Sequence, residues 1–430
     1  MKCLKTNIIR NHLYRNKENI LHQTIPTVKS FFKWTVISII LGLFMGLLGT
    51  AFHYSIESAA YLRESHWWII LTLPLGGIAI VFLYRGMGLK RDKGTNLVLL
   101  AVRENSKLSL RQLVCIFFAT VITHLCGGSS GREGAALQIG GCVGAGSGRI
   151  LRLDEDDCRI ITMCGMSAGF AALFGTPVAS AIFAMEVISI GILHYSAIVP
   201  CMFSAAVASF ISGKFGVTGL SMNVIIPNTD FTEMGKTIIL AVFCAVLSYV
   251  FCIVIKWTAY GYKRIFKNRY IRIAAGGVIV ACITLLIGTQ MYNGAGVPVI
   301  LNAFNERAGA EEFVLKLLLT ALTLGAGFKG GEIIPVFFVG STFGSALSGI
   351  FGISPSFGAS IGLIGLFCGV TNCPLTTLIL SIELFGSQGL LFYGITIAVS
   401  YMLSGYTGLY SAQKIVYSKV KTKFINQKII

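Results

Sequence analysis

Long apolar runs dominate this sequence and restrict what it can fold into. The runs Phe31 to Phe52, Thr237 to Ile255 and Leu390 to Leu403 contain one charged residue between them. An α-helix needs about 20 consecutive apolar residues to cross a bilayer, and several runs approach this length. Every backbone polar group in hydrocarbon needs a partner within the protein, so such runs predict helices. We therefore expect an all-α integral membrane protein that crosses the bilayer several times.

Charge is scarce and unevenly distributed. Charged residues make up 12% of the 430 residues, against about 25% in soluble domains. The net charge of +17 is carried mainly by residues 2–33, residues 414–428 and short connections at 85–93, 103–111, 149–159 and 256–272. Basic residues next to apolar spans mark cytoplasmic loops. This pattern predicts an even number of crossings of a bacterial-type inner (plasma) membrane with both termini cytoplasmic, and no nucleic-acid partner.

Other targeting and cofactor signals are weak. About thirty polar and charged residues precede the first apolar run, which is not typical of a cleavable signal peptide. The 12 cysteines occur singly, mostly inside apolar runs, without a CxxC pair. This spacing supports neither a disulfide framework nor a zinc site. We expect no metal and no cofactor.

Three sequence elements recur about 200 residues apart and in the same order. The pairs are Gly131–Gly140 with Gly331–Gly340, Gly175-Thr176-Pro177 with Asn372-Cys373-Pro374, and Gly86-Met87-Gly88 with Gly294-Ala295-Gly296. In the second pair the proline stands nine residues before a glutamate in both copies, Glu186 and Glu383. We interpret this as an internal duplication. The predicted divisions are a basic N-terminal segment 1–30, a first membrane repeat 31–212, a second membrane repeat 213–412 and a basic tail 413–430.

The first pair combines glycine-rich loops with apolar helix starts. Duplicated halves with broken apolar segments in matching positions are the best sequence indication of a transport site. A helix that begins inside the bilayer directs free backbone N–H groups, and about half a positive charge, toward that point. Glycines there allow the backbone to approach a ligand closely. The two loops therefore predict an anion site, whereas the spaced glycines Gly140, Gly144 and Gly148 are better explained by close helix packing.

Four acids fall at predicted membrane depth, where ionisable groups are costly and often functional. Glu133 and Glu332 occupy equivalent places at the two glycine-flanked helix starts. A carboxylate there can fill the anion site when ionised and leave it when protonated, which couples anion movement to a proton. Glu186 and Glu383 end apolar helices, and for them a structural role at a helix–loop junction is the preferred interpretation.

Four motifs resemble those of the CLC anion channels and transporters. They are GxG at residues 86–88, GREG at 131–134, GGxxxP at 330–335 and Leu-Tyr-Ser-Ala at 409–412, in the order of that family. The resemblance implies a CLC fold of about eighteen helices, many incomplete, in two repeats of inverted topology. It further implies a homodimer with one pathway per subunit, a gating role for Glu133, and a Tyr410 hydroxyl lining the inner anion site. We expect no nucleotide-binding tail.

Several positions depart from the usual family pattern. Met87 stands where a serine hydroxyl usually faces the anion, and Val187 replaces the inner proton-transfer glutamate. Glu332 occupies a normally apolar place in GGxxxP, and Ala135 follows GREG in place of proline. These departures resemble the fluoride-exporting CLC branch, although Ile334 stands where that branch can have threonine. The resemblance therefore implies fluoride export coupled to proton import.

The predicted site draws on both halves of the chain. Glu133 and Glu332 are the gating and proton-coupling pair. The anion-binding candidates are Met87, Gly131, Arg132, Gly134, Ile333, Ile334 and Tyr410, with Phe337 and Phe338 as candidates to line the pathway through their positive ring edges. The alternative is a chloride-selective CLC channel or chloride/proton exchanger. An intramembrane enzyme using the buried acids is a remote alternative, since the sequence contains no HExxH, GxSxG or P-loop motif.

Overall fold

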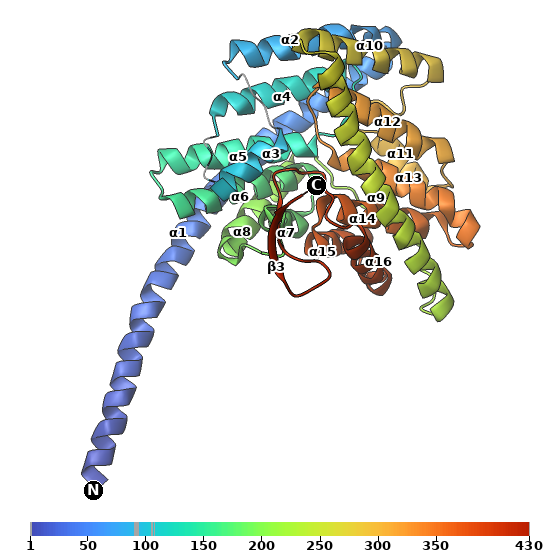
Figure 1. Ribbon diagram of the computed structural model, residues 1–430. Helices are drawn as coiled ribbons and strands as arrows, with labels where there is room; N and C mark the ends of the chain where they lie inside the picture. Colours follow the sequence, from blue (N-terminus) through green and yellow to red (C-terminus); the bar gives the residue numbers. More distant parts are fainter. Residues whose placement is uncertain (1, 90–93, 105, 107, 430) are drawn as a thin grey trace.

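The computed structural model describes residues 2–89, 94–104, 106 and 108–429, with side chains from residue 26 onward. Parts of two basic connections, at 90–93, 105 and 107, and the two terminal residues lie outside this description. The described residues form sixteen α-helices, two short 3-10 helices and three short strands (Figure 1). The prediction of an all-α membrane fold is confirmed as a mostly helical one, and the three strands are an addition to it.

The first half of the chain begins with the longest helix, α1. Its elements are α1 Lys2–Ser65, η1 Trp67–Thr72, α2 Leu73–Gly86, α3 Thr95–Glu104, α4 Leu110–Leu125, α5 Glu133–Ile150, α6 Glu155–Phe174, α7 Pro177–Glu186, β1 Ser189–Ile190, η2 Tyr195–Ala197 and α8 Ile198–Lys214. The N-terminal part of α1 extends away from the helical body in Figure 1. Residues 2–30 of the predicted basic segment are therefore continuous with the helix that contains the first apolar run.

The second half follows a similar order. Its elements are α9 Phe231–Ile265, α10 Arg269–Ile287, α11 Val297–Asn305, α12 Ala310–Ala326, α13 Ile333–Phe351, α14 Pro355–Thr371, α15 Pro374–Phe385, α16 Leu390–Leu403, β2 Lys414–Tyr417 and β3 Phe424–Lys428. The run α12 to α15 repeats the run α4 to α7, since each contains a glycine-rich loop after its first helix and a proline at the start of its last. The repeat boundaries at 31–212 and 213–412 stay predictions.

Seven helical stretches of the described chain are long and apolar enough to cross a membrane, by length and composition. They are residues 26–65, 67–86, 155–174, 195–214, 231–265, 269–287 and 333–351. Other apolar helices, such as α7 and α15, have only 10 and 12 residues. Such short helices begin or end inside the fold. This places helix termini, with their unpaired backbone groups, among buried side chains.

Glycines bring helices into backbone contact in both halves. A Cβ added to Gly140 of α5 would lie 2.0 Å from the carbonyl oxygen of Gly165 in α6. A Cβ added to Gly344 of α13 would lie 1.9 Å from the carbonyl oxygen of Gly358 in α14. These distances leave no room for any side chain. Close packing of small residues drives helix association in membranes, as we expected for the spaced glycines.

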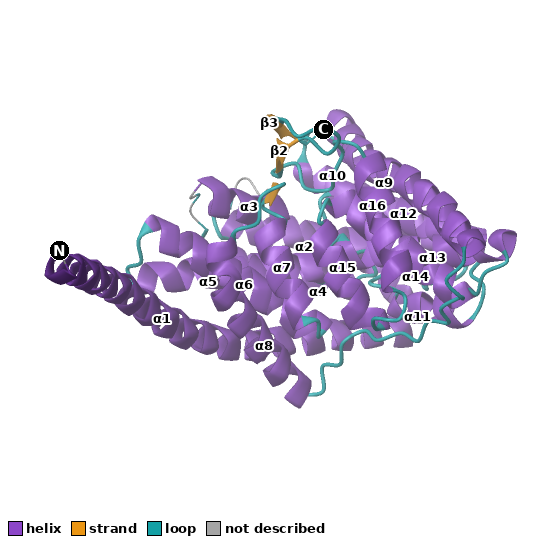
Figure 2. Ribbon diagram, turned by 90° about the horizontal axis from the view of Figure 1, so that it is seen from below, coloured by secondary structure: helices purple, strands orange, loops and turns teal. Residues whose placement is uncertain are grey.

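The C-terminal tail forms a small sheet, which the prediction of a wholly α-helical fold missed. β1 pairs in parallel with β2, and β2 pairs antiparallel with β3; Figure 2 shows these strands together at the edge of the helical body. Ile190, Ile415 and Ile429 form a separate small core beneath them. The tail is also anchored by Lys419, which donates to the carbonyl of Tyr401 at 3.0 Å. Strands this short are stabilised by these contacts rather than by the β-propensity of their own residues.

Candidate functional site

The two glycine-rich loops meet at the centre of the molecule. The N–H of Gly131 donates to the carbonyl of Gly331 at 2.7 Å, and the N–H of Gly331 donates to the carbonyl of Gly131 at 2.6 Å. This reciprocal pair is an isolated antiparallel bridge between positions that match in the sequence repeat. A Cβ on Gly331 would lie 2.5 Å from the backbone nitrogen of Gly134. Glycine is therefore required for the two helix starts to touch.

Glu133 is the first residue of α5 and is 2% exposed. Its Oε2 accepts a hydrogen bond from the backbone N–H of Arg132 at 2.9 Å. The Nε of the Arg132 side chain lies 3.5 Å from Glu133 Oε1. A carboxylate at a helix N-terminus is stabilised by the helix dipole. The structure thus places the carboxylate at the N-terminal end of α5.

Glu332 takes the matching position before α13 but has different partners. It is the residue that precedes the first helical residue, Ile333. Its Oε2 is buried and has no hydrogen-bond partner among the described residues. A Cβ added to Gly134 would lie 3.4 Å from this oxygen. The two predicted acids are therefore brought together across the bridge, and one has an unused buried oxygen.

Tyr410 lies in the loop after α16 and is 1% exposed. The loop is held because the N–H of Leu409 donates to the carbonyl of Val370 at 2.8 Å. The Tyr410 hydroxyl has no hydrogen-bond partner among the described residues. A buried hydroxyl without a partner is a donor available to a ligand. Tyr410 is thus a third buried polar residue of the predicted site.

The apolar candidates lie in the first turns of α13. Ile333 and Ile334 begin α13 and are buried. The Phe337 ring packs edge-on against Phe174 and Phe367, with centroids 5.5 and 5.3 Å away. The centroid of the Phe338 ring lies 5.1 Å from the Nζ of Lys316. A lining role for the two phenylalanines stays a prediction.

Two further family-derived positions lie at the C-terminal ends of helices. Met87 caps the end of α2, is partly exposed and packs against the hydrophobic core. It lies three residues after Tyr84, whose ring is 5.1 Å from the Nζ of Lys329 in the loop before α13. Val187 caps α7 and is buried. An apolar side chain there offers no route for a proton.

Glu186 and Glu383 have structural roles at helix starts, as expected. Glu186 ends α7 and accepts from the N–H groups of Leu375 and Thr376 at 3.1 and 2.8 Å. Glu383, near the end of α15, accepts from the N–H groups of Val178 and Ala179 at 3.0 and 2.8 Å. Each half therefore caps the short helix of the other half.

Buried bases are the main feature that the sequence reasoning missed. Lys316 in α12 is fully buried and donates to the carbonyls of Tyr292 and Gly294 at 3.0 and 2.7 Å. Arg63 near the end of α1 is 3% exposed. The Arg132 side chain is held by His53 of α1. A charge inside an apolar helix is a sequence signal for Lys316, but nothing local marks His53 as a neighbour of Arg132.

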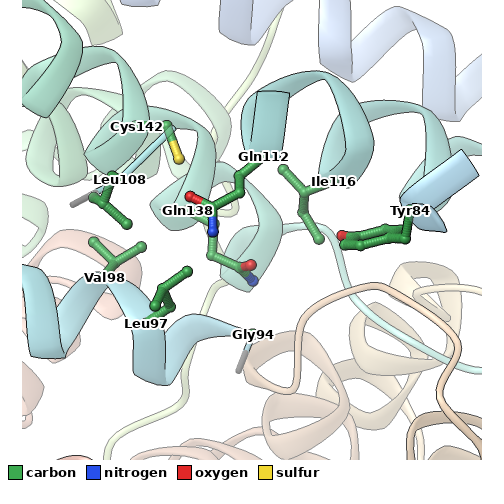
Figure 3. A pocket seen from close by; sticks show the side chains of 9 residues that line it. All are labelled: Tyr84, Gly94, Leu97, Val98, Leu108, Gln112, Ile116, Gln138 and Cys142. Carbon is green, nitrogen blue, oxygen red and sulfur yellow. The ribbon is translucent and has the colours of Figure 1, made fainter. Parts of the chain in front are cut away.

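Figure 3 shows a small pocket beside the first turns of α5. Gln138 faces it and donates to the carbonyl of Gly134 at 3.1 Å and to Thr95 Oγ1 at 3.3 Å. The enclosed space fits about one water molecule. The pocket therefore lies between the start of α5 and helices α3 and α4, and its small size makes it no candidate for a ligand site.

The sequence profile described as "Voltage gated chloride channel" matches residues 76–405. A chloride/fluoride channel protein of Pseudomonas syringae pv. tomato is 34% identical over 396 residues, which cover 90% of this chain and 87% of that protein. The chain belongs to the CLC family. It is a multi-pass membrane protein of a family that transports anions, so the enzyme alternative is set aside.

Solved structures agree with this assignment. A crystal structure of a CLC-type fluoride/proton antiporter is similar with a TM-score of 0.86 and 32% identity, covering 89% of this chain and 98% of the other. A crystal structure of a slow cyanobacterial Cl⁻/H⁺ antiporter has a TM-score of 0.73 and 21% identity, covering 86% and 94%. The first supports the family and the fold, and the second supports the fold. The CLC resemblance and its fold are thus confirmed.

Proposed function

We propose that this CLC protein exports fluoride in exchange for imported protons, through a pathway gated by Glu133. The observation that carries the proposal is the burial of two carboxyl groups, Glu133 and Glu332, at two helix starts that are bridged through their glycine-rich loops. Relatives described as a chloride/fluoride channel and a fluoride/proton antiporter support the choice of substrate. Met87, in the place of a serine hydroxyl, supports it as well.

The mechanism follows from competition for the helix starts. The ionised Glu133 carboxylate occupies the position in front of α5, where backbone N–H groups and the helix dipole favour negative charge. Protonation removes that charge, so the side chain can swing away and an anion can take its place. Each exchange then moves one proton on Glu133 against the anion. Arg132, Gly131 and Gly134 hold the loop in the shape this exchange needs.

Fluoride needs close hydrogen-bond donors because it is small and strongly hydrated. The N–H groups that begin α13 at Ile333 and Ile334 and the Tyr410 hydroxyl are such donors. A protonated Glu332 adds another and can relay a proton across the bridge, in place of the route lost at Val187. Met87 contributes a polarizable thioether instead of a hydroxyl. The preference for fluoride over chloride is assigned to this donor set.

We also assign the orientation and assembly. Basic residues before and after the membrane helices support cytoplasmic termini in a bacterial-type plasma membrane. The end of α1 near Ser65 then faces outward. Membership of the family supports a homodimer with one pathway in each subunit. Labelling of single cysteines near each end of α1 from one side of intact cells tests the orientation, and light scattering of the purified protein tests the dimer.

The decisive experiment uses purified protein in liposomes. A fluoride or chloride gradient is imposed, and anion efflux is recorded with an electrode together with proton uptake. We expect fluoride efflux to exceed chloride efflux and to be matched by proton uptake, and Glu133→Gln to remove the coupled movement. Faster chloride than fluoride efflux would favour the chloride alternative. Coupled fluoride efflux unchanged in Glu133→Gln contradicts the proposed gate.

A further inference from the structure

Both backbone polar groups of Ala412 are bound by side chains of α3. The N–H of Ala412 donates to Asn96 Oδ1 at 2.8 Å, and its carbonyl accepts from Arg103 Nη1. Asn96 lies near the start of α3 and Arg103 near its end, seven positions apart, which places them on one face of the helix. We call these two residues the α3 clamp. One helix thus holds one residue of the C-terminal loop through two side chains.

The clamped residue belongs to the turn that begins with Tyr410. The N–H of Gln413 donates to the carbonyl of Tyr410 at 3.0 Å, which closes a four-residue turn with Ala412 in its third position. The Tyr410 side chain is buried, and its hydroxyl has no hydrogen-bond partner among the described residues. The backbone of the turn therefore determines where this hydroxyl lies.

Helix α14 holds the same turn from another side. The N–H of Leu409 donates to the carbonyl of Val370, and Gln413 Nε2 donates to the carbonyl of Thr371 at 2.9 Å. Val370 and Thr371 are the last two residues of α14. Two bonds to adjacent carbonyls attach the segment but allow it to rotate about the line that joins them. The α3 clamp adds two attachments from a different helix and so removes this rotation.

Helix α3 is itself bound to the start of α5. Gln138 Nε2 donates both to Thr95 Oγ1, at 3.3 Å, and to the carbonyl of Gly134, at 3.1 Å; Figure 3 shows Gln138 beside the start of α3. A Cβ added to Gly134 would lie 3.4 Å from Thr95 Oγ1. Thr95 precedes Asn96 in the sequence. The first turn of α3 therefore contacts both the start of α5 and the turn after α16.

We propose that Asn96 and Arg103 are positioning residues that fix the place of the Tyr410 hydroxyl relative to the start of α5. The inference rests on the proposed function, in which this hydroxyl is a donor to fluoride. Hydrogen bonds weaken steeply away from their preferred distance and angle, and a working site needs its donors held to within about 0.5 Å by the residues behind them. Fluoride is smaller than chloride, so a displaced donor weakens fluoride binding more. The α3 clamp thereby contributes to the preference for fluoride.

The α3 clamp acts through position rather than through charge. Arg103 Nη2 lies 2.5 Å from Glu104 Oε1, so a carboxylate offsets the guanidinium charge. Asn96 carries no charge and yet binds the same residue as Arg103. Loss of either member should therefore have the same kind of effect, which direct attraction between Arg103 and an anion would not produce.

The test uses the purified full-length protein in liposomes. Initial fluoride efflux at a series of internal fluoride concentrations gives KM and the maximal rate, and chloride is measured in the same way. Arg103→Met keeps a long side chain without a donor, Asn96→Ala removes the acceptor, and Tyr410→Phe removes the hydroxyl. The control is Arg149→Met, because Arg149 also donates to a backbone carbonyl, that of Leu108, which lies outside this turn.

The expected effect is on KM for fluoride. Tyr410→Phe should raise it about tenfold, as for a lost hydrogen bond to an ion, and each clamp variant by roughly threefold to tenfold, because the hydroxyl is displaced rather than removed. The ratio of chloride to fluoride efflux should rise in all three. Arg103→Lys restores a donor and should recover the native KM, and Arg149→Met should keep it. If Arg103→Met does not fold, Asn96→Ala with a native thermal midpoint decides.

A double variant separates positioning from a general structural role. If the α3 clamp acts through the hydroxyl, adding Arg103→Met to Tyr410→Phe should leave KM where Tyr410→Phe alone puts it. A general structural role would instead lower the thermal midpoint and add the same loss in either background.

The outcomes that overturn the inference can be told apart. A native KM in both clamp variants with a raised KM in Tyr410→Phe, or additive losses in the double variant, removes the α3 clamp and leaves the proposed function intact. A native KM in Tyr410→Phe removes the hydroxyl as a donor, and the inference with it, while lost coupling in Glu133→Gln would still support the gate. A protein that moves neither fluoride nor chloride overturns the proposed function as well.

Discussion

The helix starts at Glu133 and Glu332 share a backbone but not an electrostatic environment. Both follow a glycine-rich loop, and their loops exchange the same pair of hydrogen bonds through Gly131 and Gly331. Glu133, however, has an adjacent guanidinium and accepts a hydrogen bond from the Arg132 backbone N–H. Glu332 has a buried oxygen without a partner among the described residues.

This difference assigns unequal tasks to two symmetric positions. Duplication supplies two helix starts that can both attract an anion, and the neighbouring side chains then decide which acid is held and which is free. Glu133, restrained by Arg132, suits a gate that changes position. Glu332, with a buried oxygen that has no hydrogen-bond partner among the described residues, suits a group that exchanges a proton in place. The backbone symmetry and the side-chain asymmetry can be tested separately.

The largest effect is expected at the glycines that bring helices into backbone contact in the same way in both halves. Gly140→Ala and Gly344→Ala would place a methyl group about 2 Å from a carbonyl oxygen of the facing helix. Overpacking against rigid backbone should cost about 3 kcal/mol in each half, the upper end of the usual range. The thermal midpoint of the purified protein in detergent measures this. Gly394→Ala is the matched control, because a Cβ there meets nothing within 4 Å.

Similar losses of thermal stability in both glycine variants, with none in the control, would confirm that both halves are packed through the same kind of glycine contact between helices. A stable Gly344→Ala protein would show that α13 and α14 can separate, so the symmetry of the packing would fail.

The two acids should differ in the next experiment. Glu133→Gln removes the group that vacates the site and should lower coupled fluoride efflux by about 100-fold, about 2.7 kcal/mol. Glu332→Gln keeps a side chain that can donate a hydrogen bond but carries no exchangeable charge, so we expect a loss of about tenfold. The ratio of protons to fluoride in liposomes separates slower transport from lost coupling. Equal losses would mean that the two acids act as one unit.

Sequence reasoning could predict the parts of this site that depend on local pattern. Glycine clusters, prolines and apolar runs are local signals, so the positions of Glu133 and Glu332 at helix starts were within reach. The partners of Arg132 were not, because His53 lies 79 residues away in the sequence. The tail strands were missed for the same reason: β2 pairs with β1, more than 200 residues earlier. Contacts of this kind are decided by tertiary packing.

The reciprocal caps should show a smaller asymmetry. The Glu186 carboxylate is buried and also accepts from the Thr376 hydroxyl at 2.6 Å, while Glu383 is partly exposed and accepts only backbone bonds among the described residues. Glu186→Gln should therefore destabilise the protein by about 2 kcal/mol and Glu383→Gln by about 1 kcal/mol, as expected for charge-assisted bonds. Thermal midpoints at fixed detergent concentration measure the difference. A larger loss at Glu383 contradicts this ranking.

The smallest effect is expected for the selectivity between chloride and fluoride. It is tested by comparing Met87 with Ala295, the residue at the matching position of the second half. A serine at residue 87 restores a hydroxyl where the CLC pattern usually has one, and one donor changes relative affinity by about 1 kcal/mol, or roughly fivefold. Met87→Ser should therefore shift the ratio of chloride to fluoride efflux toward chloride by about this factor. Ala295→Ser adds the same hydroxyl to the matching GxG element of the second half, beside Gly294, whose carbonyl already binds Lys316. If both variants shift the ratio equally, selectivity belongs to the shared backbone; a shift in Met87→Ser alone assigns it to the first half.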